Sequence, residues 1–257
     1  MISPMFRLRT LFSSARTSPY FLTDALISLL LMLAFLAWDS TGWDMALAQP
    51  WGNSDGFALR DNWWMSTVMH NGARNLGWLI FLALLIDVWK PWGEFKHMAK
   101  ADRWGVFLSF VGALLSVTLI KAFSHTSCPW DLQTFGGTAP YVSHWNVWLD
   151  DGGGGHCFPA GHASTGFAFI AVYFGLRQAS VLGARKYLLM AMLAGFVLGL
   201  SQQMRGAHFM SHTLWTAWLC WTVGWTSHLV YHLLLSKQTA SALMRRSLQA
   251  TKSKQPN

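Results

Sequence analysis

The sequence predicts an all-α fold, a bundle of six transmembrane helices. Two features of the composition favour a membrane protein: 53% of the 257 residues are hydrophobic, and only 12% are charged. A soluble domain of ordinary composition carries about 25% charged residues. The third observation is a series of apolar runs, each near the length of about 20 residues that crosses a bilayer.

Six such runs define the predicted helices and the domain organisation. The first follows a basic segment, the third ends on Lys121, and a short turn with Arg205 separates the last two. The predicted transmembrane domain covers 20–235, between an N-terminal segment at 1–19 and a polar tail at 236–257. The runs lie near Tyr20–Trp38, Asn71–Trp89, Trp104–Lys121, Ser164–Leu182, Tyr187–Met204 and His208–Leu235.

The basic residues divide unevenly between the two sides of this bundle. With a cytoplasmic N-terminus and six crossings, all but four of the 19 lysines and arginines lie inside, which follows the positive-inside rule. Only Arg60, Arg74, Lys121 and Arg205 lie outside. We therefore predict an integral protein of a bacterial inner membrane with both termini cytoplasmic. The net charge of +8 does not indicate nucleic-acid binding, because the basic residues alternate with apolar runs.

The first run also resembles a signal peptide, with a basic flank and a small-x-small sequence at Ala46-Leu47-Ala48. That sequence lies far beyond the end of the apolar run. We expect an uncleaved first helix.

Three clusters of reactive residue types lie at the outer ends of the predicted helices. The first is Lys121 with Cys128-Pro129. A lysine at a helix end can simply extend to the interface, but the polar segment after it favours a point charge for phosphate. All three clusters would face water on one side, which predicts an active site at the outer (periplasmic) interface.

The second cluster is Pro159-Ala160-Gly161-His162, directly before the fourth run and after four glycines at 152–155. Backbone N–H groups at a helix start can hold an anion. Gly161 allows close approach, and His162 can donate a proton to a leaving oxygen. The alternative is a proline turn with an interfacial histidine.

The third cluster contains His208 and His212, whose i,i+4 spacing places them on one face of a helix. Arg205 precedes them, and its fork geometry suits phosphate, although an arginine here can also anchor the interface. Together the clusters indicate phosphate-ester chemistry at a membrane.

These segments resemble the signature of the type-2 phosphatidic acid phosphatase superfamily, membrane lipid phosphatases related to vanadium haloperoxidases. The family pattern is K-x6-R-P, P-S-G-H and S-R-x5-H-x3-D. Order and spacing agree over about a third of the chain, with four replaced positions. Cysteine, glutamine and histidine stand for Arg, Arg and Asp, and alanine stands for Ser, at Cys128, Gln202, His212 and Ala160.

The resemblance implies hydrolysis of a lipid phosphate or diphosphate through a phosphohistidine, with no metal and no cofactor. It implies His208 as the nucleophile, His162 as the acid for the leaving group, and Lys121 as the holder of the phosphate oxygens. Ala160 and Gly161 would line the phosphate pocket. The candidate lipids are undecaprenyl diphosphate, lipid A and phosphatidylglycerophosphate.

The replaced positions call for compensation. We expect Arg205 to recover one lost positive charge, and His212 to accept a hydrogen bond from His208 that fixes its tautomer. Further candidates lie in the second outer loop: Asp150 or Asp151 could reach the nucleophile His208 and support it, and His125 or His156 could add contacts to the phosphate.

Cys128 and Cys157 lie in that same loop, beside the first and second motifs. In an oxidising periplasm a disulfide between them would fasten the two halves of the site, and two free thiols are the alternative. Cys220 falls within the last run and is expected to be a packing residue.

Three other functions stay open on the sequence alone. One is phosphotransfer to a second lipid, and another is binding or transport of a lipid headgroup without turnover. The third is a metal site formed by His208 and His212 with His162, His156 or Cys157, which lacks a neighbouring glutamate base. The oligomeric state is open as well.

Overall fold

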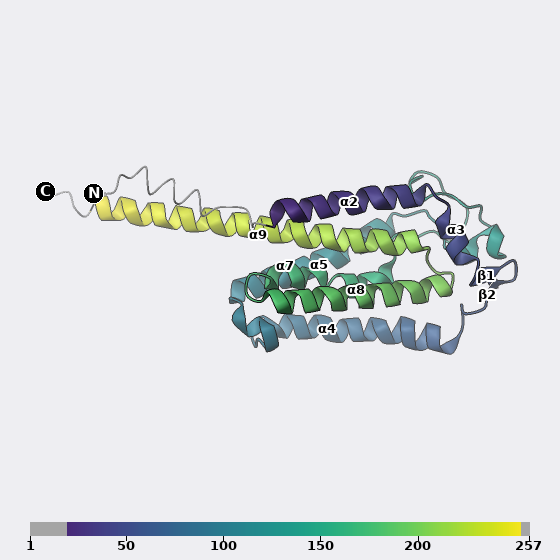
Figure 1. The fold of residues 1–257 in the computed structure, drawn as a ribbon, viewed down its shortest axis with the longest axis horizontal. Helices are drawn as coiled ribbons and strands as arrows, with labels where there is room; N and C mark the ends of the chain where they lie inside the picture. Colours follow the sequence, from purple (N-terminus) through teal and green to yellow (C-terminus); the bar gives the residue numbers. More distant parts are fainter. Residues whose placement is uncertain (1–19, 253–257) are drawn as a thin grey trace.

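The computed structural model describes residues 20–252 and is mostly helical (Figure 1). The predicted N-terminal segment at 1–19 and residues 253–257 lie outside the described residues. The elements in order are α2 (Phe21–Asp39), α3 (Trp43–Ala48), β1 (Gly52–Asn53), β2 (Gly56–Phe57), η1 (Trp64–Gly72), α4 (Ala73–Asp87), η2 (Gly93–His97), α5 (Lys100–Ala122), η3 (Pro129–Asp131), η4 (Gln133–Phe135), α6 (Gly161–Phe167), α7 (Ile170–Leu176), α8 (Val181–Met204) and α9 (Met210–Lys252).

The all-α prediction misses one small element. Strands β1 and β2 pair antiparallel, with Gly52 opposite Phe57 and Asn53 opposite Gly56. Gly56 has φ of 103°, a conformation that favours glycine at such a tight turn. Two-residue strands produce no apolar alternation, so sequence periodicity could not indicate them.

Among the described residues, three helices are long and apolar enough to cross a membrane: α2, α5 and α8. On α2 most leucine side chains are exposed, as expected for a helix that faces lipid. The chain is thus supported as an integral membrane protein, and six crossings stay a prediction.

The fourth predicted run is divided between α6 and α7, and its last residues belong to α8. At the division, Phe169 and Ala171 donate to the carbonyls three residues earlier, which tightens the chain into 3₁₀ turns. Gly166 lies so close to α8 that a Cβ there would be 2.3 Å from the Gly195 nitrogen. This close contact fixes α6, and hence the start of the second motif, against α8.

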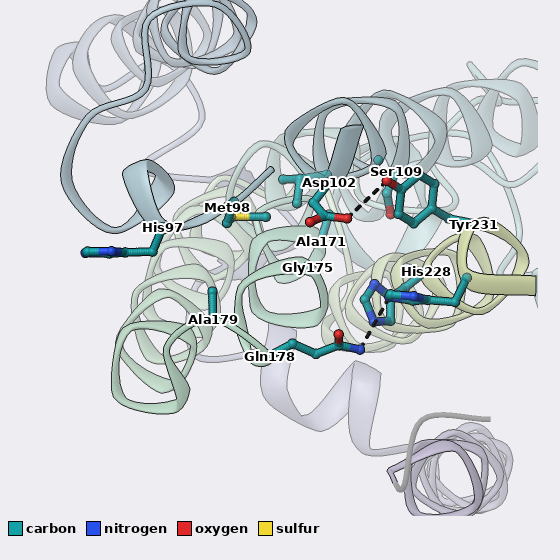
Figure 2. A pocket seen from close by; sticks show the side chains of 13 residues that line it. His97, Met98, Asp102, Ser109, Ala171, Gly175, Gln178, Ala179, His228 and Tyr231 are labelled. Carbon is teal, nitrogen blue, oxygen red and sulfur yellow. Dashed lines mark hydrogen bonds between the residues drawn. The ribbon is translucent and has the colours of Figure 1, made fainter. Parts of the chain in front are cut away.

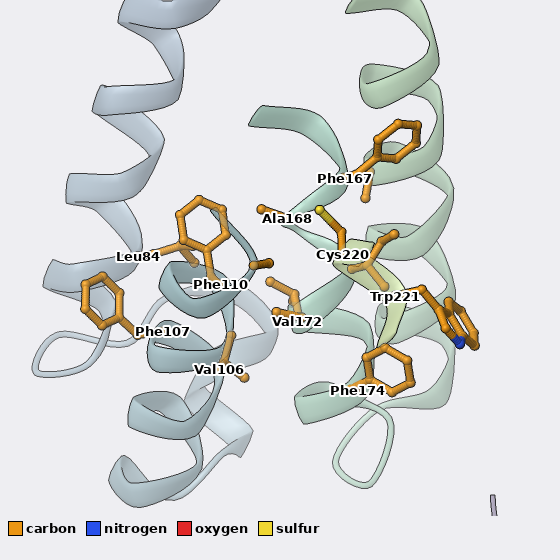
Figure 3. Close-up of a cluster of buried hydrophobic side chains, with 14 of the residues drawn as sticks. Leu84, Val106, Phe107, Phe110, Phe167, Ala168, Val172, Phe174, Cys220 and Trp221 are labelled. Atoms are coloured by element: carbon orange, nitrogen blue, oxygen red, sulfur yellow. The ribbon is translucent and has the colours of Figure 1, made fainter. Parts of the chain in front are cut away.

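The main core is formed by side chains from helices α4, α5, α6, α7, α8 and α9 (Figure 3). Phe110 on α5, Phe174 on α7 and Trp221 on α9 bury large aromatic rings there. A second, smaller cluster supports the loops at the end of the bundle where α5 finishes, and includes Phe57, Phe135 and Phe209.

Helix α9 runs past the bundle at the opposite end (Figure 1). It continues to Lys252, so most of the predicted polar tail is helical.

At the end of the bundle from which α9 extends, a cavity of about 230 Å³ opens between α5, α7 and α9 (Figure 2). It is lined by Asp102, which accepts from the Tyr231 hydroxyl at 3.0 Å, and by Ser109 and His228. Asp102 and Lys121 are about 28 Å apart along α5, so this cavity is separate from the motif cluster.

Candidate active site

The three motifs come together at one end of the bundle. Lys121 lies in the last turn of α5, His162 in the first turn of α6, and His208 in the turn before α9. A Cβ built on Gly161 would lie 3.6 Å from the Lys121 Cδ, so the lysine stem runs over that glycine. His208 interacts electrostatically with both Lys121 and His162. The structure therefore gathers the residues that the motifs single out, and their roles stay predictions.

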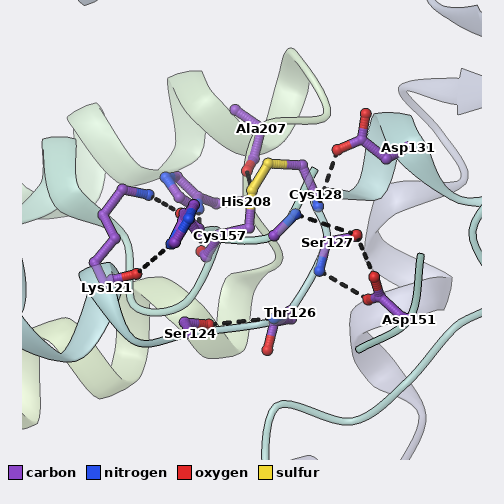
Figure 4. Close-up of a disulfide and its surroundings, with 12 residues drawn as sticks. Lys121, Ser124, Thr126, Ser127, Cys128, Asp131, Asp151, Cys157, Ala207 and His208 are labelled. Atoms are coloured by element: carbon purple, nitrogen blue, oxygen red, sulfur yellow. Dashed lines mark hydrogen bonds between the residues drawn. A yellow bond between two sulfur atoms is a disulfide. The ribbon is translucent and has the colours of Figure 1, made fainter. Parts of the chain in front are cut away.

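Lys121 does not extend freely into solvent. Its Nζ donates to the backbone carbonyl of His156, and the His156 Nδ1 lies 3.1 Å from the Lys121 carbonyl oxygen, to which it can donate. These two contacts tie the end of α5 to the loop before α6. The ammonium group is thereby held beside His208 (Figure 4).

His162 has a neighbour that the sequence did not single out. Its ring packs on the ring of His70, at the end of η1, with centroids 3.9 Å apart. Arg74 acts electrostatically on both rings. A lone histidine ahead of an apolar run carries no spacing signal, so only the fold could bring His70 to the site.

The His208 ring is held in one tautomer. Its side chain is buried, and its Nδ1 lies 2.7 Å from the backbone carbonyl oxygen of Cys157. A carbonyl oxygen only accepts, so Nδ1 carries the proton. In the neutral ring the lone pair is then on Nε2, which is the nitrogen available to attack phosphorus.

The charge state of His208 follows from its surroundings. The residue lies in the turn ahead of Met210, where α9 begins. Burial lowers the pKa of His208 well below its usual range, and the positive charge of Lys121 acts in the same direction. The neutral, nucleophilic form is therefore favoured.

The expected hydrogen bond from His208 to His212 is absent from the structure. The Nδ1 proton of His208 is already donated to Cys157, and the two rings meet at 65° with centroids 5.7 Å apart. His212 is buried, and its Nδ1 has no hydrogen-bond partner within residues 20–252. A backbone carbonyl thus occupies the place that the sequence assigned to His212.

Two carboxylates, those of Asp39 and Asp44, contact the immediate neighbours of His212. The His144 Nε2 is 3.3 Å from Asp39 Oδ2, and the His144 ring meets His212 edge-on at 5.8 Å. Asp44 accepts from the backbone N–H of Ser211 at 2.9 Å. A cavity of about 10 Å³ between Asp44, His144 and His212 has room for roughly one water molecule. Neither aspartate stands at a motif spacing, so sequence patterns could not single them out.

The loop between α5 and α6 is closed by a disulfide between Cys128 and Cys157 (Figure 4). Their Cα atoms are 5.1 Å apart, and the Cys157 N–H donates to the Thr126 carbonyl at 2.9 Å. The Cys157 Sγ also contacts the Ala207 carbonyl oxygen at 3.4 Å. The half-cystine that orients His208 is therefore fixed on both sides by its own backbone and sulfur contacts.

Gln202, which stands where the third motif has an arginine, is hydrogen-bonded to Arg205. Gln202 is buried, and its Oε1 accepts from Nη1 of Arg205 at 3.1 Å. The Nε of Arg205 donates to the Arg60 carbonyl at 2.9 Å, and the guanidinium lies 6.0 Å from the Trp130 ring centroid. Arg205 acts electrostatically on His162 and His70. A positive charge is thus held beside the motif, three residues from its expected position.

Ala160 does not offer a free backbone donor. Its N–H donates to the His212 carbonyl at 3.2 Å, and its own carbonyl accepts from the Thr216 hydroxyl at 3.2 Å. The predicted phosphate contact from the Ala160 N–H is therefore replaced by a link to α9. Gly161 begins α6 beneath the Lys121 stem, and its predicted phosphate contact stays a prediction.

The loop aspartates do not reach the nucleophile. Asp151 accepts from the N–H and the hydroxyl of Ser127 at 2.9 and 2.5 Å, and Asp150 accepts from the Gly152 N–H at 2.9 Å. Both carboxylates shape the loop itself, so the idea that they assist His208 is wrong for this structure. Of the two loop histidines, His156 contacts Lys121.

The alternative of a metal site at His208 and His212 is not supported by the arrangement of the described side chains. Within residues 20–252, no group of three or more His, Cys, Asp or Glu side chains is placed to hold a metal ion.

Comparison with known proteins gives two similarities. The family model of the PAP2 superfamily matches residues 103–235, just over half of the chain. A solved structure described as the first transmembrane PAP2 type phosphatidylglycerolphosphate phosphatase from Bacillus subtilis is 18% identical, with 87% of this chain and 97% of that chain covered and a TM-score of 0.45. Structural likeness at that level carries nothing over to this chain. No curated protein matches the sequence.

Proposed function

Since the chain belongs to the PAP2 superfamily, as its three motifs predict, we propose that it hydrolyses a lipid-linked phosphate or diphosphate at the outer face of the membrane. Family membership supports phosphatase activity in general. The apolar helices α2, α5 and α8 support a substrate that reaches the site from the bilayer.

The observation that carries this proposal is the tautomer of His208. With Nδ1–H donated to Cys157, Nε2 of the neutral ring attacks phosphorus and forms a P–N bond. The bond from phosphorus to the leaving oxygen breaks, and His162 gives a proton to that oxygen. Burial and the neighbouring cations lower the pKa of His162 to about 3 without substrate, so the negative charge of the bound phosphate has to raise it for His162 to act as the acid. Water then attacks the phosphohistidine, His162 takes a proton from it, and inorganic phosphate leaves with His208 neutral again.

Lys121 and Arg205 supply positive charge around the transferred group. Phosphoryl transfer concentrates negative charge on the non-bridging oxygens, and fixed cations stabilise it. Lys121 stands beside His208, and Arg205 acts on the His162 side. His70, packed on His162, restricts the orientation of the acid.

A phosphate-release assay tests this function. Purified protein in lipid vesicles is offered a panel that includes undecaprenyl diphosphate, lipid A and phosphatidylglycerophosphate. We expect release that continues in the presence of chelator, is inhibited by vanadate and is lost in His208→Ala. The matched control is His97→Ala at the opposite end of the bundle, which should stay active.

The same assay separates the alternatives. Tight binding of a lipid phosphate with no release by the unsubstituted protein would favour a binding or transport protein. Phosphate recovered on a second lipid would identify a phosphotransferase. Release that persisted in His208→Ala would refute the nucleophile assignment.

A further inference from the structure

The second outer loop carries an apolar tip that the rest of residues 20–252 leaves exposed. Val147, Trp148 and Leu149 are 51%, 96% and 53% exposed. We refer to these three residues as the tip. Three consecutive exposed apolar residues in a loop are unusual on a surface that faces only water.

The tip is held at a fixed place by contacts on both sides. Before it, the Trp145 indole N–H donates to Asp39 Oδ2 at 2.9 Å, and the Trp145 ring packs edge-on against Trp215 at 5.1 Å. After it, Asp151 accepts two hydrogen bonds from Ser127. Two turns join these supports, closed by Asn146 N–H to the Ser143 carbonyl and Leu149 N–H to the Asn146 carbonyl. The tip is therefore presented by an ordered loop.

These supports place the tip at the level where the bundle leaves the bilayer. Asp39 is the last residue of α2, and Trp215 lies in the second turn of α9. The leucines of α2 that precede Asp39, such as Leu33 and Leu36, are 52% and 40% exposed and face outward. The apolar surface of α2 is therefore continuous with the support of the tip. Tryptophan is the residue type that favours this interfacial level.

The charge of the segment also fits an interfacial position. No lysine or arginine lies between residues 141 and 151, and the acidic residues Asp150 and Asp151 follow the tip. Attraction to anionic headgroups therefore cannot hold it at the membrane. Apolar contact with the lipid has to provide the affinity.

The loop that carries the tip also contacts the segment that leads into the second motif. His144, next to Trp145, stacks on Phe158 with ring centroids 4.1 Å apart. Phe158 directly precedes the second motif. We propose that the tip inserts into the outer leaflet beside the site and so keeps the lipid surface at the entrance, which rests on the proposed lipid substrate. The partner is the lipid interface, not a second protein.

Insertion can be measured without any catalysis. An environment-sensitive bimane label is attached at Trp148→Cys in a Cys220→Ser background, and the protein is placed in vesicles of phosphatidylethanolamine and phosphatidylglycerol. We expect quenching by lipids that carry a nitroxide near the headgroup and protection from iodide in water. The matched control is Ser54→Cys, at the exposed turn of the β1–β2 hairpin, where iodide should quench and the nitroxide lipids should not.

A label at Trp148→Cys that iodide quenches and nitroxide lipids do not would overturn the proposal. Protection from both quenchers would equally contradict it, since that result indicates a protein contact. Both outcomes are independent of whether the protein hydrolyses phosphate, so failure here and failure of the proposed function are distinguishable.

Turnover tests the role of the inserted tip. In Trp148→Ala/Leu149→Ala, we expect KM for a long-chain lipid phosphate in vesicles to rise about tenfold, because lost apolar burial weakens engagement with the surface. The kcat/KM for a short-chain, water-soluble phosphatidic acid should stay within about twofold, since that substrate needs no surface. Equal loss on both substrates would show that the tip acts through the site itself and would refute its role at the lipid surface.

Discussion

The backbone carbonyl of Cys157 accepts the Nδ1 proton of His208 at 2.7 Å, and Cys157 is at the same time one half of the only disulfide within residues 20–252. The disulfide to Cys128 is thus connected to the proposed nucleophile through the backbone of Cys157.

Removal of the disulfide is expected to impair catalysis through His208. In Cys128→Ser the Cys157 carbonyl loses a covalent support, and we expect kcat to fall about tenfold, as for other groups that orient a reacting side chain. Cys220→Ser, which removes the buried free cysteine, is the matched control and should retain activity. Treatment with a membrane-impermeant reductant should reproduce the loss in the unsubstituted protein. An unchanged kcat in both experiments would contradict this role.

The pH dependence of His208 follows from its lowered pKa. An unfolded histidine takes up a proton near pH 6.5, whereas folded His208 should stay neutral to a lower pH because of burial and Lys121. ¹⁵N NMR of labelled imidazoles, assigned by loss of signals in His208→Gln, should show the Nδ1–H tautomer persisting below about pH 6.5. Because the unfolded state then binds more protons, this residue also lowers stability as the pH falls through that range. Protonation of His208 at or above about pH 6.5 would contradict the account.

Arg205 should matter through its charge, and Gln202 through its hold on Arg205. We expect Arg205→Ala to lower kcat/KM by about 10- to 100-fold, the range for loss of a charged hydrogen bond. Gln202→Ala removes one support of the guanidinium but keeps its charge, so a smaller loss is expected. Michaelis–Menten kinetics of both variants check this order. A larger loss in Gln202→Ala would show that the glutamine itself contacts the substrate.

Gly206 is expected to fix the turn that presents His208. Its φ is 77°, and a Cβ there would lie 2.3 Å from a ring carbon of Phe57. Gly152 is a matched control, with φ of 76° and nothing within 4 Å of the added Cβ. Each alanine costs about 1–2 kcal/mol for the left-handed backbone, and Gly206→Ala adds about 1–3 kcal/mol of overpacking. Chemical denaturation should show Gly206→Ala as the less stable variant, and equal losses would refute the contact with Phe57.

The family and most of the long helices could be predicted because apolar runs and motif spacing are local in sequence. Lys121, His162 and His208 stand at run ends, and helix geometry alone brings such ends to one side. The pairing of Cys128 with Cys157 was foreseen from their shared loop and is present in the structure. Arg205 was expected to replace a lost charge, and its link to Gln202 supports that proposal.

What the sequence missed depends on backbone contacts and on distant segments. The partner of His208 is a carbonyl, which every residue has, so no residue type could mark it. His70 and Asp39 reach the site only through the packing of η1 and α2 against later helices. Asp151 was expected to support the nucleophile His208 because of its place in the loop, but its carboxylate accepts hydrogen bonds from Ser127 and stabilises the loop instead.

The most direct test of the central claim is to trap the covalent intermediate. Protein in vesicles is mixed with a lipid carrying a ³²P-labelled terminal phosphate, quenched within milliseconds and analysed for acid-labile, alkali-stable label on the chain. The account predicts label on His208, none in His208→Asn, and accumulation in His162→Gln with a leaving group that needs no proton. Label on another residue, or turnover in His208→Asn, would contradict it.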